Sequence, residues 1–133
     1  MALHYAGRDF IAAAIIGDET ITPFDNLNAH IGVGDGDAEL DPEHTDLQGE
    51  NKERAGMSVG YPILDPDGDG TKNKIAFRAE FGPSSANFAW KEWGIFNAES
   101  GGVMLNRVVE NNGTKEAGQT WIYEVEIDVL VGS

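Results

Sequence analysis

Alternation of apolar residues with mainly polar ones in two segments is the feature that most restricts the fold of this chain. In the first segment, Lys74–Phe81, every second residue is apolar: Ile75, Phe77, Ala79 and Phe81. In the second segment, residues 121–130, the same spacing recurs: Trp121, Tyr123, Val125, Ile127 and Val129. Because successive side chains of a β-strand point to opposite faces, each segment predicts a strand with one buried face and one solvated face.

The remaining segments predict a mainly β chain with one helix. Apolar residues at helical spacing predict an N-terminal helix over about residues 6–16, and Gly17 is suited to end it. Three further strands are expected, the last two as a hairpin: residues 29–33, 88–97 and 102–110. The 133 residues, with no Cys, predict a single domain (1–133), β-rich over 29–131. We expect an antiparallel sheet or a small β-sandwich with one N-terminal helix, with an α+β arrangement as the alternative.

The charge balance argues against some classes of partner. The chain has 23 acidic and 9 basic residues, a formal net charge of -14 and a pI near 4.3. This charge would repel nucleic acids and anionic membranes, so neither is an expected partner. No apolar run approaches the roughly 20 residues of a membrane span, and no secretory signal is visible. Strong self-repulsion suits a halophilic habitat, with an ordinary acidic protein as the alternative.

One serine lies in a pattern that is typical of hydrolases. Residues 56–60 (GMSVG) match the G-x-S-x-G nucleophile elbow, which needs a helix directly after the serine. Pro62 disfavours a helical conformation at Tyr61, so we interpret Ser58 as an ordinary strand residue. The three histidines also lack the spacing of a zinc site. The sequence therefore predicts no catalytic residue and no enzymatic activity.

An acidic turn is the one candidate metal site. The run DPDGDGT places carboxylates at the first, third and fifth positions and a glycine at the sixth, as in the opening of a calcium-binding EF-hand loop. The twelfth position is Ala76 instead of the bidentate Glu, and no helix is expected on either side. The sequence thus predicts at most a weak calcium site, with a solvated turn as the alternative. Its ligands would be Asp65, Asp67, Asp69 and Thr71.

Residues 88–96 contain more aromatic residues than any other segment of the chain. Large apolar side chains occur at both even and odd positions of this segment, so they would point to both faces of a strand. A strand with large apolar side chains on both faces must be covered on both. The second face needs either a sandwiching sheet or a neighbouring subunit. The residues predicted to form this interface or core are Phe88, Trp90, Trp93, Ile95, Phe96, Met104 and Leu105.

These segments resemble proteins of virus particles. Residues 87–98 (NFAWKEWGIFNA) followed by 101–107 (GGVMLNR) are similar to the pattern E-W/I-G-I/L-F-N/D-A…G-x-M-L-x-R in small structural proteins of tailed phages and archaeal tailed viruses. Upstream, residues 29–36 (AHIGVGDG), 45–47 (TDL) and Arg54 resemble the V-G-D-G…T-x-L…E…R opening of phage tail-collar and tail-fibre attachment domains. The similarity covers roughly residues 28–130 in the same order.

The resemblance implies a non-enzymatic structural protein of a tailed virus particle, made in the host cytoplasm. A fibre would be expected to continue into a repetitive shaft, so we expect an accessory protein on the capsid exterior, as head decoration or turret component. The alternative is a tail, collar or baseplate component, and a third hypothesis is a calcium-dependent glycan-binding module. Expected partners are further copies of the chain, with a trimer preferred, and the major capsid protein or tail proteins.

Overall fold

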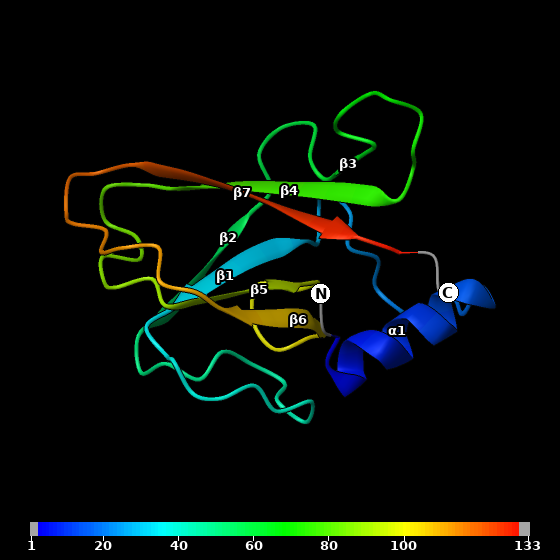
Figure 1. The fold of residues 1–133 in the computed structure, drawn as a ribbon, viewed down its shortest axis with the longest axis horizontal. Coiled ribbons are helices and arrows are strands. Elements are labelled where there is room, and N and C mark those ends of the chain that lie inside the picture. The colour runs from blue at the N-terminus through cyan, green and yellow to red at the C-terminus, as the bar shows by residue number, and fades with distance from the viewer. Residues whose placement is uncertain (1–2, 131–133) are drawn as a thin grey trace.

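The computed structural model describes residues 3–130, which form one helix and two antiparallel sheets (Figure 1). The helix is α1 (Tyr5–Ile15). The first sheet has the order β2-β1-β5-β6 and consists of β1 (His30–Gly34), β2 (Lys52–Gly56), β5 (Glu92–Phe96) and β6 (Met104–Val109). The second has the order β3-β4-β7 and consists of β3 (Ile63–Leu64), β4 (Lys74–Phe81) and β7 (Trp121–Asp128). The predicted mainly β fold with one N-terminal helix is confirmed.

The main hydrophobic core lies between the two sheets. Inward-facing residues of β1 and β5 meet those of β4 and β7, among them Ile31, Val33, Trp93, Ile95, Phe77, Phe81, Val125 and Ile127. Trp90 lies at the centre of an aromatic cluster, with its ring in edge contact with Phe81, Trp121 and Tyr123. The two segments with alternating apolar residues form β4 and β7. These two strands pair with each other along eight residue pairs.

The predicted hairpin exists, but its first strand is shorter than expected. Strand β5 begins at Glu92, whereas the prediction began four residues earlier. Residues 88–91 instead run beside residues 110–115, where Trp90 N donates to Gly113 O at 2.8 Å and Lys115 N to Phe88 O at 3.1 Å. Trp90 therefore lies outside β5, in the same inter-sheet core as Trp93. Residue 131 of the predicted β-rich region lies outside the described residues.

Helix α1 rests on the edge strand β6 by its first turns only. Gly7 is buried, and a Cβ atom there would overlap the carbonyl oxygen of Leu105, so the helix backbone lies directly on the strand. Phe10 makes an edge contact with Phe24 one turn later. The last turn continues past the sandwich (Figure 1). No helix within residues 3–130 is long and apolar enough to cross a membrane.

Candidate functional site

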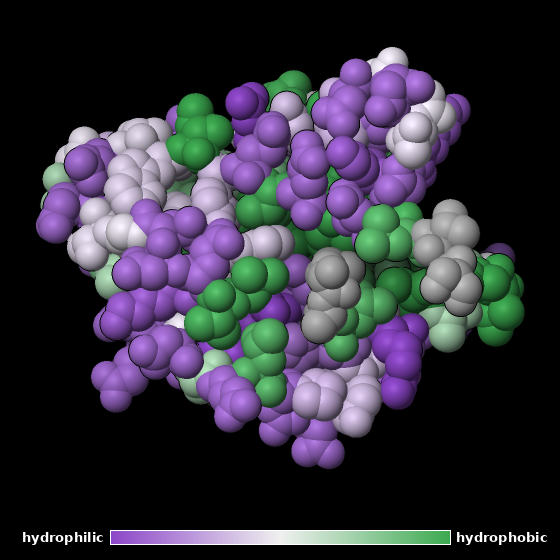
Figure 2. Space-filling model, in the orientation of Figure 1, coloured by the Kyte–Doolittle hydropathy of each residue, from purple (hydrophilic) through white to green (hydrophobic). Residues whose placement is uncertain are grey.

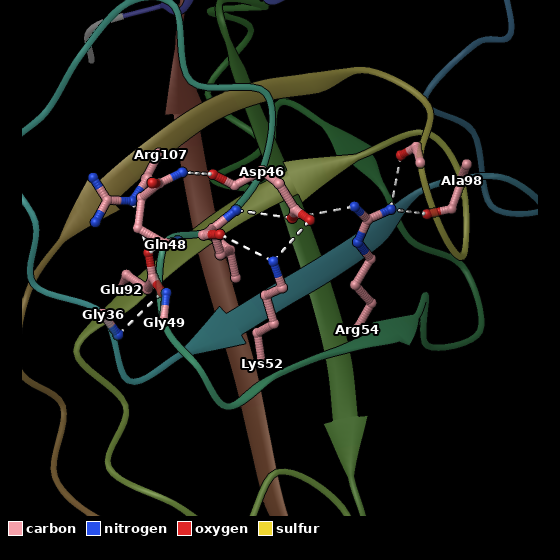
Figure 3. Close-up of polar contacts among 11 residues, drawn as sticks. Gly36, Asp46, Gln48, Gly49, Lys52, Arg54, Glu92, Ala98 and Arg107 are labelled. Carbon is pink, nitrogen blue, oxygen red and sulfur yellow. Dashed lines mark hydrogen bonds and ion pairs between the residues drawn. The ribbon is translucent and has the colours of Figure 1, made fainter.

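A buried carboxylate on the outer face of the first sheet joins the segments that carry the viral resemblance (Figure 3). The Glu92 carboxylate accepts hydrogen bonds from the backbone N–H groups of Gly36 at 3.1 Å, Gln48 at 2.9 Å and Gly49 at 2.7 Å. Arg107 Nε donates to the same carboxylate at 2.7 Å. These bonds hold the loop of residues 35–50, here called the covering loop, on strands β5 and β6.

Both members of the Glu92–Arg107 ion pair are fully removed from solvent. Their side chains are 0% exposed, and Arg107 Nη1 also donates to Ala38 O at 3.0 Å in the covering loop. Gly34 lies beneath the carboxylate, where a Cβ atom would overlap Glu92 Oε2. Gly34 of the V-G-D-G motif thus provides the space that Glu92, of the E-W-G-I-F motif, occupies.

A second cation closes the other end of the covering loop. Arg54 Nη1 donates to the carbonyl oxygens of Ala98 and Gly101, both at 2.9 Å, and its guanidinium lies 3.5 Å from the centroid of the Phe96 ring. Asp46 accepts from Arg54 at 3.4 Å and from Lys52 at 3.1 Å. Burial alone would raise the pKa of Asp46, but these two cations and the Leu47 N–H lower it below its usual value.

The predicted interface or core residues are all used inside this single chain. Trp90, Trp93, Ile95 and Leu105 lie in the inter-sheet core, and Phe88 packs against it. On the opposite face of β5, Phe96 and Met104 form a small cluster with Leu47 of the covering loop. The second face of the aromatic segment is therefore covered by the chain itself.

The carboxylates of the predicted calcium site are engaged by groups of the same loop and by Lys74. Asp67 is paired with Lys74 at 3.2 Å. Asp65 accepts from Gly70 N at 3.0 Å. Asp69 accepts from Thr71 N at 2.8 Å, a hydrogen bond that lowers the pKa of Asp69. Within residues 3–130 no three Asp, Glu or His side chains are grouped as metal ligands, and calcium binding stays a prediction.

A thermal melt tests the calcium prediction. If the loop rearranges to bind calcium, a concentration ~100 times the dissociation constant is expected to stabilise the fold by ~2.7 kcal/mol. The double variant Asp67→Asn, Asp69→Asn should lose this increment and keep the response to sodium chloride. An unchanged melting temperature of the parent protein in calcium, compared with sodium chloride at equal ionic strength, would show that the loop is a plain acidic turn.

Two histidines that lie far apart in the sequence are stacked at the start of helix α1. His4 is buried, and its ring lies 6.2 Å from that of His44 between centroids. Burial, together with His44 and Arg107, lowers the pKa of His4, whereas Asp41 opposes that shift. His4 also precedes the first residue of α1 and does not cap it through its side chain. The 39 residues between His4 and His44 hid this pair from pattern reasoning.

Ser58 lies in a turn and lacks the setting of a nucleophile elbow. Its N–H donates to Arg78 O at 2.8 Å, and its carbonyl oxygen accepts from Asn26 Nδ2 at 3.1 Å. The residues after it form a turn, a cis peptide bond between Tyr61 and Pro62, and the short strand β3. No helix follows the serine, but the interpretation of Ser58 as a strand residue is wrong, because β2 ends at Gly56.

Comparison with known proteins assigns no family to the chain. A scan against protein-family models finds no match, and neither does a search of curated proteins. Function is therefore inferred from the residues and their geometry.

Proposed function

We propose that the chain is a non-enzymatic structural protein of a tailed virus particle, which acts by docking on other virion proteins. The motifs that resemble virion proteins supply the parts that hold the covering loop on the sheet, namely Gly34, Arg54, Glu92 and Arg107. Their role in folding leaves docking to other parts of the surface. The observation that carries the proposal is an exposed apolar end on helix α1.

The exposed end of α1 is an uncharged surface on a strongly acidic molecule. Ile15 and Ile16 are 79% and 82% exposed, and Ile11 lies one turn before Ile15 on the same helix face. Figure 2 shows apolar residues gathered at this end of the molecule, over the last turn of α1. Residues 10–17 contain no charged side chain, although the chain as a whole carries a net charge of -14. Clustered exposed apolar side chains typically mark a protein interface, so we propose that α1 docks the domain on its partner.

Two positions in the particle fit this proposal. The first is an accessory place on the capsid exterior, as head decoration or turret component in many symmetry-related copies, with the major capsid protein as partner. The second is a tail, collar or baseplate position, which the resemblance of residues 29–54 to tail-collar and tail-fibre attachment domains supports. Homo-oligomers, with a trimer preferred, are compatible with either position.

Purified particles provide the direct test. We expect quantitative mass spectrometry of gradient-purified virions to find the chain in many copies per particle. Antibodies against the chain should label the head surface in electron micrographs if it is decoration, and the tail or its base in the second case. Recovery of the chain only from lysates of infected cells, and never from virions, would refute the proposal.

Replacing the two exposed isoleucines tests the docking surface. We expect the double variant Ile15→Ser, Ile16→Ser to lower incorporation into particles at least about tenfold, since each buried isoleucine contributes ~1.5–3 kcal/mol and 1.4 kcal/mol is tenfold. Stability of the free protein should change by less than ~0.5 kcal/mol, because both side chains are exposed. The matched control is Val59→Ser, an equally apolar residue that is 98% exposed in the turn after β2. Equal incorporation of both variants would show that α1 does not dock.

A further inference from the structure

Strand β7 has a long unpaired edge. It is the last strand of its sheet and pairs with β4 along eight consecutive residues with no bulge. Among residues 3–130 no backbone hydrogen bond reaches the other side of Trp121–Asp128. Natural proteins usually shorten, bend or cover such an edge, because its free N–H and C=O groups accept a further strand.

One hydrogen bond determines which backbone groups are free. Val129 N donates to Asn73 O at 2.8 Å, so these two residues form a hydrogen-bonded pair at the end of the ladder between β4 and β7. Such pairs occur at every second residue in an antiparallel ladder, so the odd-numbered residues of β7 bond to β4. The N–H and C=O groups that point away from β4 therefore belong to Ile122, Glu124, Glu126 and Asp128.

The outer face beside these free groups has more acid than base. Glu124, Glu126 and Asp128 are exposed in a row, at every second residue. Arg78 offsets only the first of them, at 3.5 Å from Glu124. Lys74, opposite Asp128, is bonded instead to Asp67 at 3.2 Å. Among residues 3–130, the edge thus combines free backbone groups with two carboxylates, Glu126 and Asp128, that are attracted by Lys74 but form no direct ion pair.

On the inner side, the same strand borders an aromatic hollow. The hollow has a volume of about 360 Å³ and is lined by Trp90, Trp121 and Tyr123 together with Asn112 and Thr120. The hollow borders β7 only at residues 121–123, so inward side chains of an added strand would reach it beside these residues, and side chains of the other parity would lie over the acidic row. The surface of β7 therefore determines which side chains an added strand needs on each of its two faces.

A second copy of this chain fits the edge poorly. Antiparallel pairing of two β7 strands about Val125 would place Glu124 of one copy opposite Glu126 of the other, on the same face. Directly opposed like charges destabilise a sheet. Two molecules that each carry a net charge of -14 also repel each other at long range.

We propose that the free edge of β7 binds an extended segment of another protein in which Lys or Arg alternates with apolar residues. The segment adds a fourth strand beside β7, with its basic side chains over Glu124, Glu126 and Asp128 and its apolar side chains towards the hollow. The identity of that protein as a virion component rests on the proposed function, whereas the chemistry of the edge does not. The edge is tested on the free protein, so its failure is distinguishable from failure of the particle tests.

Amide hydrogen exchange measured by NMR tests the edge directly. The probe is a seven-residue peptide with capped termini in which four Lys alternate with three Val. The first control replaces Lys by Glu, and the second has the same residues with the four Lys followed by the three Val. All measurements are made at equal ionic strength. We expect the alternating Lys peptide to slow exchange of the Ile122, Glu124, Glu126 and Asp128 amides at least about tenfold, equivalent to 1.4 kcal/mol. The amides of Tyr123, Val125 and Ile127, already bonded to β4, should change little.

Two variants separate charge from backbone pairing. Glu124→Gln, Glu126→Gln should weaken binding of the Lys peptide at least about tenfold, while the matched pair Glu50→Gln, Glu99→Gln, exposed acids elsewhere, should leave it unchanged. Glu126→Pro removes one outward N–H without cutting the ladder to β4 and should abolish protection of the neighbouring amides.

Three results would overturn the proposal. Equal protection by the control peptide in which the four Lys precede the three Val would reveal charge attraction without strand pairing. Protection that rises with protein concentration, with no peptide present, would show that a second copy occupies the edge. No protection by any peptide would show that the acidic row only guards the edge against other strands.

Discussion

Replacing Glu92 by alanine is expected to lower the free energy of unfolding by ~3–5 kcal/mol, a large part of the ~5–15 kcal/mol that holds a domain of this size. The substitution leaves the Arg107 guanidinium buried without its counter-charge. It also removes the acceptor of three backbone N–H groups, which belong to Gly36, Gln48 and Gly49. Urea unfolding followed by tryptophan fluorescence measures the loss. Limited proteolysis should show earlier cleavage in residues 35–50.

The two members of the pair should differ in importance. Arg107→Met is expected to cost less than Glu92→Met, because the carboxylate keeps its three backbone donors when the guanidinium is removed. The double variant should recover only part of the loss, since an apolar pair leaves those N–H groups unpaired. Arg78→Met is the control: its ion pair with Glu124 is about two-fifths exposed and should contribute under ~1 kcal/mol. Equal losses for Glu92→Met and Arg78→Met would contradict a structural role for the buried carboxylate.

Strands with one solvated face were the predictable part of this fold. The apolar parity of Lys74–Phe81 became the inner face of β4, with Phe77, Ala79 and Phe81 buried. Strand β2 (Lys52–Gly56) was not predicted as a strand, since its residues are charged or small and largely exposed at the edge of the sheet. Its pairing with β1 depends on backbone hydrogen bonds, which leave no hydrophobic pattern in the sequence.

The network around Glu92 was beyond pattern reasoning for a different reason. A glutamate among apolar residues is ordinary on the solvated face of a strand, and nothing local indicates that residues 35–50 cover this face. One signal was present, because β5 carries large apolar groups on both parities and must be covered on both faces. A charged residue in a doubly covered strand requires a buried partner. That partner is Arg107, the arginine that ends the G-G-V-M-L-N-R motif.

The aromatic core is the second place where a single substitution should have a large effect. Trp90→Ala and Trp93→Ala are each expected to lower the free energy of unfolding by ~3–5 kcal/mol, because both side chains are buried between the sheets and truncation leaves a cavity. Ser58→Ala, in the turn after β2, should cost under ~1 kcal/mol. Urea unfolding curves compare the three variants. Comparable midpoints for Trp93→Ala and Ser58→Ala would show that the aromatic segment does not stabilise the fold.

Substitution of the same two tryptophans by phenylalanine distinguishes packing from hydrogen bonding. Trp90 Nε1 donates to Ala86 O at 2.9 Å, whereas Trp93 Nε1 is buried with no hydrogen-bond partner among the described residues. Both changes remove a similar volume, but only Trp90→Phe breaks a buried hydrogen bond, after which Ala86 O keeps the Phe88 N–H as its one donor, whereas Trp93→Phe removes an unpaired N–H. We therefore expect Trp90→Phe to be the more destabilising by ~0.5–1.5 kcal/mol, the net contribution of one hydrogen bond. Equal losses would show that Trp93 Nε1 finds a partner in solution, such as an ordered water, and that both indoles are held by hydrogen bonds as well as by packing.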